Sequence, residues 1–171
     1  MSQIILVDNL DQEIGLMDKL EAHQKGLLHR AISVFIFNSE GKLLLQQRAT
    51  SKYHSPGLWT NTACSHPYPG ETTLQSAVRR LKEEMGMETD LQKAFHFIYR
   101  AEFSNGLIEH EFDHVFVGRS DIAPTPDPDE VMNFKYLSKE EIDLSVASSP
   151  ELFTEWFKLC YNRAFQYYLN Q

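Results

Sequence analysis

The chain has 171 residues, of which 42% are hydrophobic and 12% aromatic, a composition typical of a packed domain and not of a disordered segment. Its 16 basic and 24 acidic residues give a formal net charge of −8, which argues against binding nucleic acid through a broad basic surface. A polyanionic small molecule would need local cations or metal ions to offset this negative background.

The N-terminal residues and the two cysteines bear on the compartment. Residues 1–12 show no basic region followed by an apolar run, so we expect no signal peptide. No stretch reaches the roughly 20 apolar residues of a membrane span, so we expect no membrane partner. Cys64 and Cys160 lie far apart and do not suggest a disulfide scaffold. These features predict a cytoplasmic protein.

The first predicted elements are strands. Residues 31–37 (AISVFIF) and 42–48 (KLLLQQR) flank an Asn-Ser-Glu-Gly turn, a pattern typical of a hairpin. Residues 55–57 (SPG) break the chain before LWTNTAC, where we expect another short strand.

The next element is a helix with both ends marked. Thr72 followed by Gln75 resembles a capping box, and the segment LQSAVRRLKEEM leads to Gly86 in the position that commonly ends a helix. Two extended segments should follow, over residues 94–103 and 107–118, joined by a Ser-Asn-Gly turn.

The last third begins with a connection, since residues 120–130 alternate three prolines with acids. Residues 133–138 indicate a final strand, followed by a short helix from KEEID, and residues 150–171 form an amphipathic helix rich in aromatics. Hairpins mixed with helices favour one domain of residues 1–171, of the mixed α/β (α+β) class, with a mixed sheet between helices.

The segment TNTACSHP places Cys64 two residues before His66. Pro67 biases His66 toward the extended region, so the two side chains would share one face. A small buried thiol beside a surface histidine is the ordinary explanation of such a pair. An acid or nucleophile beside a metal ligand is the other interpretation.

The segment GLIEHEFD places Glu109 and Glu111 on one strand face and His110 on the other. Two carboxylates on one face repel each other unless a cation lies between them or one is protonated. Taken alone, an exposed acidic strand face is the more common explanation of such a pair.

Three histidines could complete a site with these acids. His23 and His29 are six residues apart, so they do not share a helix face. Together with His66, Glu109 and Glu111 they would give a three-nitrogen, carboxylate-rich site suited to six-coordinate Mn²⁺ or Mg²⁺, with Zn²⁺ also suitable.

The predicted helix carries RRLKEEMG, with Glu71 eight residues before Arg79. An ordinary salt-bridged surface helix explains the charges alone. The spacing also resembles the Nudix box, whose carboxylates hold a divalent cation against a diphosphate. Arg80 stands where the box has a Glu, and Ser65 where it has a Gly. The lost carboxylate argues against hydrolysis and leaves a metal–diphosphate site open.

Four basic residues flank these motifs, and together they would supply the local positive charge that a diphosphate requires. They are Arg48, Lys52, Arg79 and Arg80. Each of them alone would be read as a solvated surface cation.

Together these pieces resemble the type 1 isopentenyl-diphosphate Δ-isomerases, a family with the Nudix fold. The resemblance runs from His23 to Trp156 and rests on GLLHRAISVFIFNSEGKLLLQQRA, PGLWTNTACSHP, RRLKEEMG, YRAEFSNGLIEHE and the late EWF. TNxxCxHP joined to E-x-E is the specific part of this match.

The resemblance implies interconversion of isopentenyl and dimethylallyl diphosphate through a tertiary carbocation. It implies Cys64 and Glu111 as the catalytic acid and base, with Glu111 as the proton donor in the forward direction, and Tyr99 assisting the transfer. It also implies that the ring of Trp156 stabilises the carbocation, although a tryptophan beside Phe153 and Phe157 is more often core. We interpret Cys160 as core packing.

The same resemblance implies the ligands of two ions. The first ion, Mn²⁺, Mg²⁺ or Zn²⁺, would be held by His23, His29, His66, Glu109 and Glu111. A second, Mg²⁺, would bridge the substrate diphosphate to Glu84. Arg48, Lys52 and Arg80 would complete the anion site.

Two other functions stay open on the sequence alone. A Nudix hydrolase of a nucleoside diphosphate derivative would not need Cys64, and Arg80 counts against it. A catalytically silent binding module would have lost the thiol or the paired acids, and this chain keeps both. We expect a small-molecule diphosphate as the partner, no nucleic acid, and a monomer or weak homodimer.

Overall fold

The computed structural model describes residues 2–171. Its nine strands are β1 (Gln3–Val7), β2 (Glu13–Asp18), β3 (His29–Phe37), β4 (Leu43–Arg48), β5 (Trp59–Thr60), β6 (Ala63–Ser65), β7 (Leu91–Glu102), β8 (Ile108–Arg119) and β9 (Val131–Leu137). The helices are α1 (Lys19–Lys25), α2 (Thr73–Met85), α3 (Lys139–Ser148), α4 (Glu155–Leu169) and the 3₁₀ turn η1 (Pro150–Leu152).

Strand β3 is the centre of the sheet. It runs parallel to β8 along its whole length, from His29 opposite Glu111 to Phe37 opposite Arg119. Its other edge pairs antiparallel with β6, where Ser33 lies opposite Cys64. With both edges filled, β3 meets β4 only at Phe37 and Leu43, and β4 continues into pairing with β9 and β5. The predicted hairpin therefore exists, but as a turn and not as a paired ribbon.

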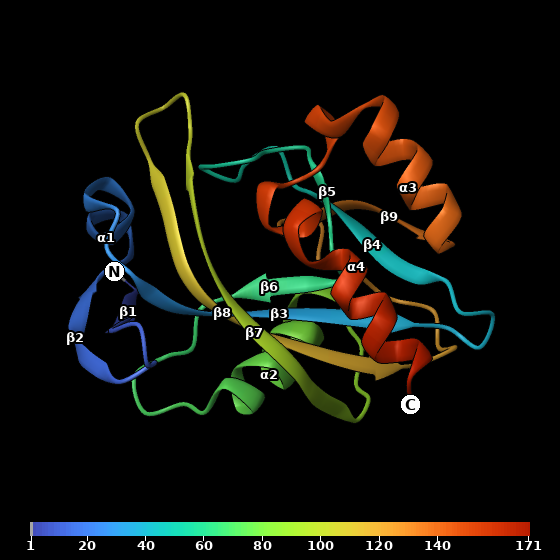
Figure 1. Cartoon of the computed structure of the whole chain (residues 1–171), viewed down its shortest axis with the longest axis horizontal. Coiled ribbons are helices and arrows are strands. Elements are labelled where there is room, and N and C mark those ends of the chain that lie inside the picture. The colour runs from blue at the N-terminus through green and yellow to red at the C-terminus, as the bar shows by residue number, and fades with distance from the viewer. Residues whose placement is uncertain (1) are drawn as a thin grey trace.

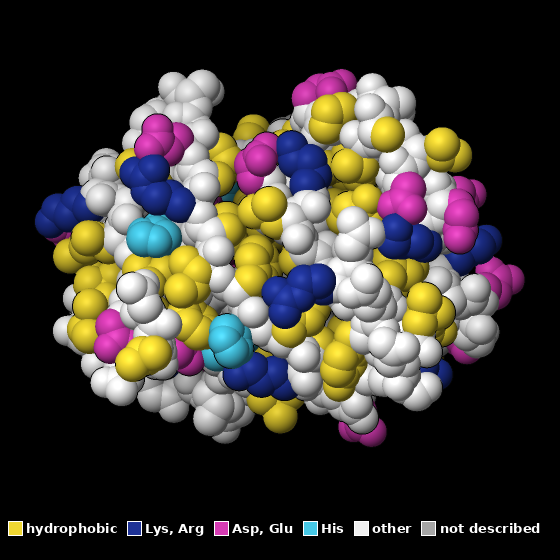
Figure 2. Space-filling model, viewed as in Figure 1, with side chains coloured by type: hydrophobic (Ala, Val, Ile, Leu, Met, Phe, Trp, Pro, Cys, Tyr) yellow, Lys and Arg dark blue, Asp and Glu magenta, His cyan; other side chains and the backbone are white. Residues whose placement is uncertain are grey.

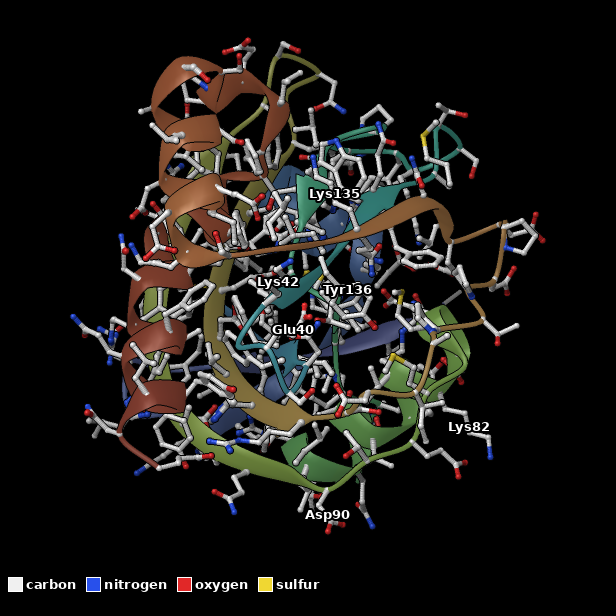
Figure 3. All side chains as sticks on the ribbon, turned by 90° about the vertical axis from the view of Figure 1, so that its right-hand side faces the viewer. Glu40, Lys42, Lys82, Asp90, Lys135 and Tyr136 are labelled. Atoms are coloured by element: carbon white, nitrogen blue, oxygen red, sulfur yellow. The ribbon has the colours of Figure 1, made fainter. Side chains whose placement is uncertain are left out.

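Helices cover both faces of the sheet, as predicted (Figure 1). The period of two along β3 sends Phe35 and Phe37 to the side of α4, and Val34 and Ile36 to the side of α2. On β9, Lys135 lies 4.0 Å from the ring of Trp59, while the next residue, Tyr136, packs against the α2 core (Figure 3). Two apolar layers thus hold β3 and β8 rigidly from both sides.

Helix α2 begins and ends where the sequence predicts. Thr72 and Gln75 form the reciprocal capping box, and Gly86 adopts a left-handed φ of 63° at the C-terminus. The C-terminal helix begins later than predicted: Pro150 starts the 3₁₀ turn, Phe153 is extended and bridges to Trp59, and α4 starts at Glu155. The N-terminal elements β1, β2 and α1 were not predicted.

The β7–β8 hairpin projects beyond the body of the sheet, opposite the loop of residues 49–57 that follows β4 (Figure 1). The side-chain amide of Asn105 at the hairpin tip donates to the carbonyl of Tyr53 in that loop, at 3.0 Å. No described helix is long and apolar enough to cross a membrane. On the face shown in Figure 2, Lys and Arg are interspersed with acidic and apolar side chains and form no single broad patch.

Candidate active site

A cavity of about 220 Å³ lies between the sheet, α1, α2, α4 and the loop of residues 49–57. This volume is below the roughly 300–1,000 Å³ of sites for drug-sized ligands, so the cavity suits a small molecule. Its lining combines cations, acids, a thiol and one indole: Lys19, Arg48, Lys52, Arg80, His54, His66, Glu109, Glu111, Cys64 and Trp156, with Ile32, Ser33, Ser51, Tyr53 and Ser65.

Two buried histidines are held with one ring nitrogen free. His23 on α1 has its Nδ1 2.6 Å from the carbonyl of Lys19, and His29 at the start of β3 has its Nδ1 2.8 Å from the carbonyl of Leu27. A carbonyl accepts only from N–H, so each neutral ring carries its proton on Nδ1 and a lone pair on Nε2. Within residues 2–171, neither buried Nε2 atom has a hydrogen-bond partner.

The paired acids of β8 point into the same space. Glu109 and Glu111 share one strand face, as predicted, and both are buried. Glu109 Oε1 lies 3.4 Å from His23 Nε2, and Glu111 Oε1 lies 3.6 Å from His29 Nε2. The hydroxyl of Tyr99 lies 2.6 Å from the other oxygen of Glu109 and 2.7 Å from that of Glu111, and its single hydrogen is donated to one of them at a time.

Strand β6 delivers the remaining pair. Cys64 and His66 both line the cavity, as does Ser65 between them. His66 Nε2 lies 3.0 Å from Glu111 Oε1. Burial lowers the pKa of His66 well below its usual value, so this ring is neutral at pH 7.

These donors fit a divalent cation. One ligand atom from each of His23, His29, His66 and Glu111 lies within 4.8 Å of the others, and Glu109 forms a second such group with His23 and His54. Imidazole and carboxylate ligands suit Mn²⁺, Mg²⁺ or Zn²⁺. The free buried Nε2 atoms, backed at Nδ1 by carbonyls, have the arrangement of metal-ligating histidines.

The environment drives the two acids apart in proton affinity. Burial and the neighbouring charge of Glu109 raise the pKa of Glu111. Burial also opposes ionisation of Glu109, but contacts with His23 and His54 outweigh it and hold the pKa of Glu109 well below its usual range. Burial beside both acids raises the pKa of Tyr99 well above 10. Glu111 is therefore the carboxyl of this pair that more readily holds a proton.

The thiol of Cys64 is partly exposed to the cavity, and Cys160 is buried in the α4 core, as predicted. Desolvation raises the pKa of Cys64 to about 12, against the opposing effect of Arg48. Arg48 Nη1 lies 3.8 Å from Cys64 Sγ. At pH 7 the resting group is thus a neutral thiol beside a fixed cation.

Trp156 lines the cavity with an indole of fixed orientation. Its Nε1 donates to Asn61 Oδ1 at 3.1 Å, and Asn61 in turn donates to the carbonyls of Val34 and Ala63. Only 3% of Trp156 is exposed. Asn61 of the TNTACSHP segment therefore orients the ring, a connection that only the structure reveals.

Comparison with known proteins places this site in a family. The model for the NUDIX domain matches residues 27–157. The chain is 53% identical over 168 residues to isopentenyl-diphosphate Delta-isomerase of Pectobacterium atrosepticum, covering 98% of this chain and 94% of that protein. It is 51% identical over 161 residues to isopentenyl-diphosphate Delta-isomerase 2 of Aromatoleum aromaticum, covering 94% and 85%.

This chain belongs to the isopentenyl-diphosphate Delta-isomerase family of NUDIX-domain proteins. The fold agrees: the crystal structure of DR0079 from Deinococcus radiodurans superimposes with a TM-score of 0.72, covering 86% of this chain and 90% of that one at 22% identity. The family and fold that the sequence predicted are thus confirmed.

Within this family member, the predicted cations divide into two sets. Arg48, Lys52 and Arg80 line the cavity. Arg79 does not, because its guanidinium donates to both carboxylate oxygens of Glu71, at 2.7 and 2.8 Å. The placement of Arg79 at the pocket was wrong, because Glu71 competes for it.

The predicted ligand Glu84 lies next to the cavity but is not part of its lining. One of its oxygens accepts from Arg80 at 2.7 Å and the other accepts from Gln46 at 2.6 Å. Arg80 also contacts Glu130, which pairs with Lys52. These partners join α2 to the loop of residues 49–57 beneath the cavity.

Sequence reasoning missed two residues of the cavity lining, Lys19 and His54, and one buried acid beside it, Asp113. Lys19 lines the cavity one helical turn before His23, and that spacing of four is the signal that could have found it. Asp113 continues the alternation of Glu109 and Glu111 and is fully buried, with Ser33 donating to it at 2.7 Å. His54 carries no local signal, because it lies in a loop.

Proposed function

We propose that the protein interconverts isopentenyl diphosphate and dimethylallyl diphosphate, a double-bond isomerisation in isoprenoid biosynthesis. The single observation that carries this is one small cavity holding Cys64, Glu111 and Trp156 beside clustered cations. In a hydrolase the thiol of Cys64 would be expendable. The membership of the chain in the isomerase family supports the same reaction.

Four cations serve the diphosphate in this proposal. The cavity is lined by four basic residues, Lys19, Arg48, Lys52 and Arg80. They supply local positive charge for a diphosphate in a protein whose net charge is −8. Arg guanidinium groups bind phosphate oxygens bidentately, and Lys supplies a mobile point charge. Glu84, adjacent to Arg80, would take the Mg²⁺ that accompanies the diphosphate.

The histidine and glutamate cluster would hold the resident ion, with His23, His29, His66, Glu109 and Glu111 as ligands. When bound, such an ion neutralises the buried carboxylates and adjusts the proton affinity of Glu111. We propose Mn²⁺, Mg²⁺ or Zn²⁺ in this position.

The reaction needs one proton added and another removed. Glu111 donates a proton to the terminal methylene carbon of isopentenyl diphosphate, and the alkene electrons leave a tertiary cation at the branched carbon. Cys64 lies on β6, which pairs with the edge of β3 opposite to β8. It removes a proton from the CH₂ group next to the branched carbon, and the electrons of that C–H bond form the new double bond. Tyr99, whose hydroxyl lies within hydrogen-bond distance of both acids, assists transfer at Glu111.

The thiol accepts a proton only as a thiolate. Because the pKa of Cys64 is raised to about 12, the thiol first passes its proton within the complex to the carboxylate of Glu111, which gives the protonated acid and a thiolate beside Arg48 at 3.8 Å. The proton that Cys64 takes from the CH₂ group at the end of the reaction restores the thiol. The ring of Trp156 presents electron density and no nucleophile to the carbocation, and the reaction requires that the bound substrate exclude water from the cavity. Asn61 fixes the indole for this role.

We also infer that the protein acts in the cytoplasm as a monomer or weak homodimer on a small-molecule diphosphate. The absence of a membrane-spanning helix among the described residues is compatible with this. Sedimentation of the purified protein at micromolar concentration measures the oligomeric state directly.

The deciding experiment is proton NMR of the purified protein with isopentenyl diphosphate, Mg²⁺ and Mn²⁺ in D₂O. We expect dimethylallyl diphosphate with deuterium in the new methyl group.

Cys64→Ala should abolish turnover and retain the fold, while the matched control Cys160→Ala should lose stability and retain turnover. Phosphate release with the alkene unmoved would instead establish a hydrolase. No reaction, with metals loaded and the fold verified, would establish a silent binding module.

A further inference from the structure

His54 is a buried histidine at the cavity that the proposed reaction does not use. It lies in the loop of residues 49–57, only 6% of it is exposed, and its Nε2 lies 2.8 Å from Glu109 Oε1. This is closer than His23 Nε2, which lies 3.4 Å from the same oxygen. A loop residue thus makes the nearest imidazole contact to Glu109.

The ring of His54 is held from several directions. It stacks on Phe103 of the β7–β8 hairpin, with centroids 5.4 Å apart and planes 14° apart, and meets Trp156 edge-on at 5.9 Å. Its carbonyl accepts from Arg48 Nη2 at 3.2 Å. Asn105 anchors the neighbouring Tyr53 to the same hairpin. The side chain therefore has one orientation, with Nε2 toward Glu109.

The second ring nitrogen separates His54 from the ligand histidines. In His23 and His29, a backbone carbonyl accepts the Nδ1 proton and leaves Nε2 free to ligate. His54 Nδ1 is buried and has no hydrogen-bond partner within residues 2–171. A ligating His54 would bury an unpaired N–H, whereas a proton on Nε2 is donated to Glu109 and leaves only a lone pair unpaired.

We propose that His54 is a positioning residue: it donates from Nε2 to Glu109 and couples the position of the loop to the carboxylate that holds the resident ion. The loop also carries Lys52, two residues earlier, so a diphosphate bound by Lys52 holds His54 against Glu109. The inference rests on the proposed function for the ion and the diphosphate.

The test uses two amides that differ in where they place a donor. In His54→Gln the amide nitrogen reaches the position of Nε2, and in His54→Asn it reaches only that of Nδ1. His96→Gln, at an exposed position on β7, is the control. Mn²⁺ affinity is measured by EPR of the free ion, with and without inorganic diphosphate. The coordinated imidazoles are counted by nitrogen spin-echo modulation.

We expect His54→Asn to weaken Mn²⁺ binding about tenfold, the scale of lost outer-sphere hydrogen bonds, and His54→Gln to remain within about threefold of the parent. Diphosphate should tighten Mn²⁺ binding in the parent, and His54→Asn should lose that coupling. The imidazole count should be the same in all variants.

Two results would overturn the proposal. Equal Mn²⁺ affinity in His54→Asn and His54→Gln, with near-ultraviolet circular dichroism unchanged, would leave His54 a packing role only. One imidazole fewer in both variants would make His54 a ligand. Neither readout requires turnover, so a failure of the isomerase assay with the parent protein would count against the proposed function and not against this inference.

Discussion

Two clusters of histidines and carboxylates lie on opposite faces of the paired strands β3 and β8. They differ in the groups that surround the ring nitrogens of their histidines. The cavity cluster comprises His23, His29, His66 and Glu111, and a second group that shares His23 adds His54 and Glu109. The outer cluster comprises Asp11, Arg30 and His114, on the opposite face of β8. Both are buried contacts between imidazole and carboxylate.

In the outer cluster the charges are already balanced. His114 Nε2 lies 2.9 Å from Asp11 Oδ2, and Arg30 Nε donates to Asp11 Oδ1 at 2.7 Å. In the cavity cluster, the Nε2 atoms of His23 and His29 have no hydrogen-bond partner within residues 2–171, and they converge with His66 and Glu111. Both ring nitrogens of the buried His114 also lack a hydrogen-bond partner within residues 2–171. A candidate metal site is therefore distinguished from a structural pair by the convergence of several ligand atoms and by carbonyls that hold Nδ1, and not by burial or by proximity to an acid.

The first prediction compares two acids on the same face of β8, Glu111 in the cavity and Asp113 two residues further along. It has the largest expected effect. Glu111→Gln removes the proton donor and a ligand, so turnover should fall by about 10³-fold or more, the upper range for a lost general acid. Deuterium incorporation by NMR measures it. The matched control is Asp113→Asn, two residues further on the same face. Burial and Glu111 raise the pKa of Asp113 well above its usual value, and an amide oxygen at this position can still accept the hydrogen bond from Ser33. An equal loss of turnover in Glu111→Gln and Asp113→Asn would contradict the assignment of Glu111 as the proton donor.

A second prediction compares one histidine from each cluster. His29→Gln should weaken Mn²⁺ binding about 100-fold, because it removes a nitrogen whose orientation β3 fixes. His114→Gln should leave the affinity within about twofold. Isothermal titration after EDTA treatment measures both, and exhaustive removal of metal should silence turnover in the parent. Weaker binding in His114→Gln alone would place the ion in the outer cluster.

A third prediction compares two adjacent arginines of α2, one that lines the cavity and one that is paired with an acid outside it. Arg80 lines the cavity and Arg79 is neutralised by Glu71. Arg80→Met should raise KM about tenfold, roughly 1.4 kcal/mol, through one lost charge-assisted contact with the diphosphate. Arg79→Met should leave KM unchanged and lower the free energy of unfolding by at most about 1 kcal/mol. Steady-state kinetics and urea unfolding of the two variants measure these effects. A raised KM in Arg79→Met would return that residue to the anion site.

Local patterns predicted much of the fold. The capping box and Gly86 fixed both ends of α2, and strand alternation placed Glu109 with Glu111. Helix α1 was missed because its seven residues give too short a periodic pattern, although Asp18 and Gly26 mark its ends. The start of α4 was misplaced because Pro150 opens a separate turn before Phe153 pairs with Trp59.

Long-range contacts explain what the sequence left open at the site. Neighbours on a helix point about 100° apart, so nothing local decides whether Arg79 or Arg80 reaches the cavity. That choice depends on Glu71, which the turn before α2 brings to Arg79. His54 enters only because the hairpin tip holds its loop through Asn105 and Phe103.

The smallest expected effect concerns the pH dependence of the outer cluster. Burial lowers the pKa of His114 to about 4, although Asp11 opposes the shift. The unfolded chain therefore binds a proton near pH 6.5 that the folded chain refuses until about pH 4, and stability falls as the pH drops through this window. The full shift corresponds to at most about 3–4 kcal/mol, and solvent near Asp11 reduces it to about 1–2 kcal/mol.

Replacing the titrating ring isolates that contribution. Urea unfolding of the metal-free protein between pH 4 and pH 7 should give a flatter profile for His114→Gln than for the parent. The exposed His96 supplies the control, since His96→Gln should keep the slope of the parent. A steeper profile in His114→Gln would mean that the folded state favours the charged ring. Asp11 would then outweigh burial, and the outer cluster would be an ion pair stabilised by acid and not a neutral contact already balanced by Arg30.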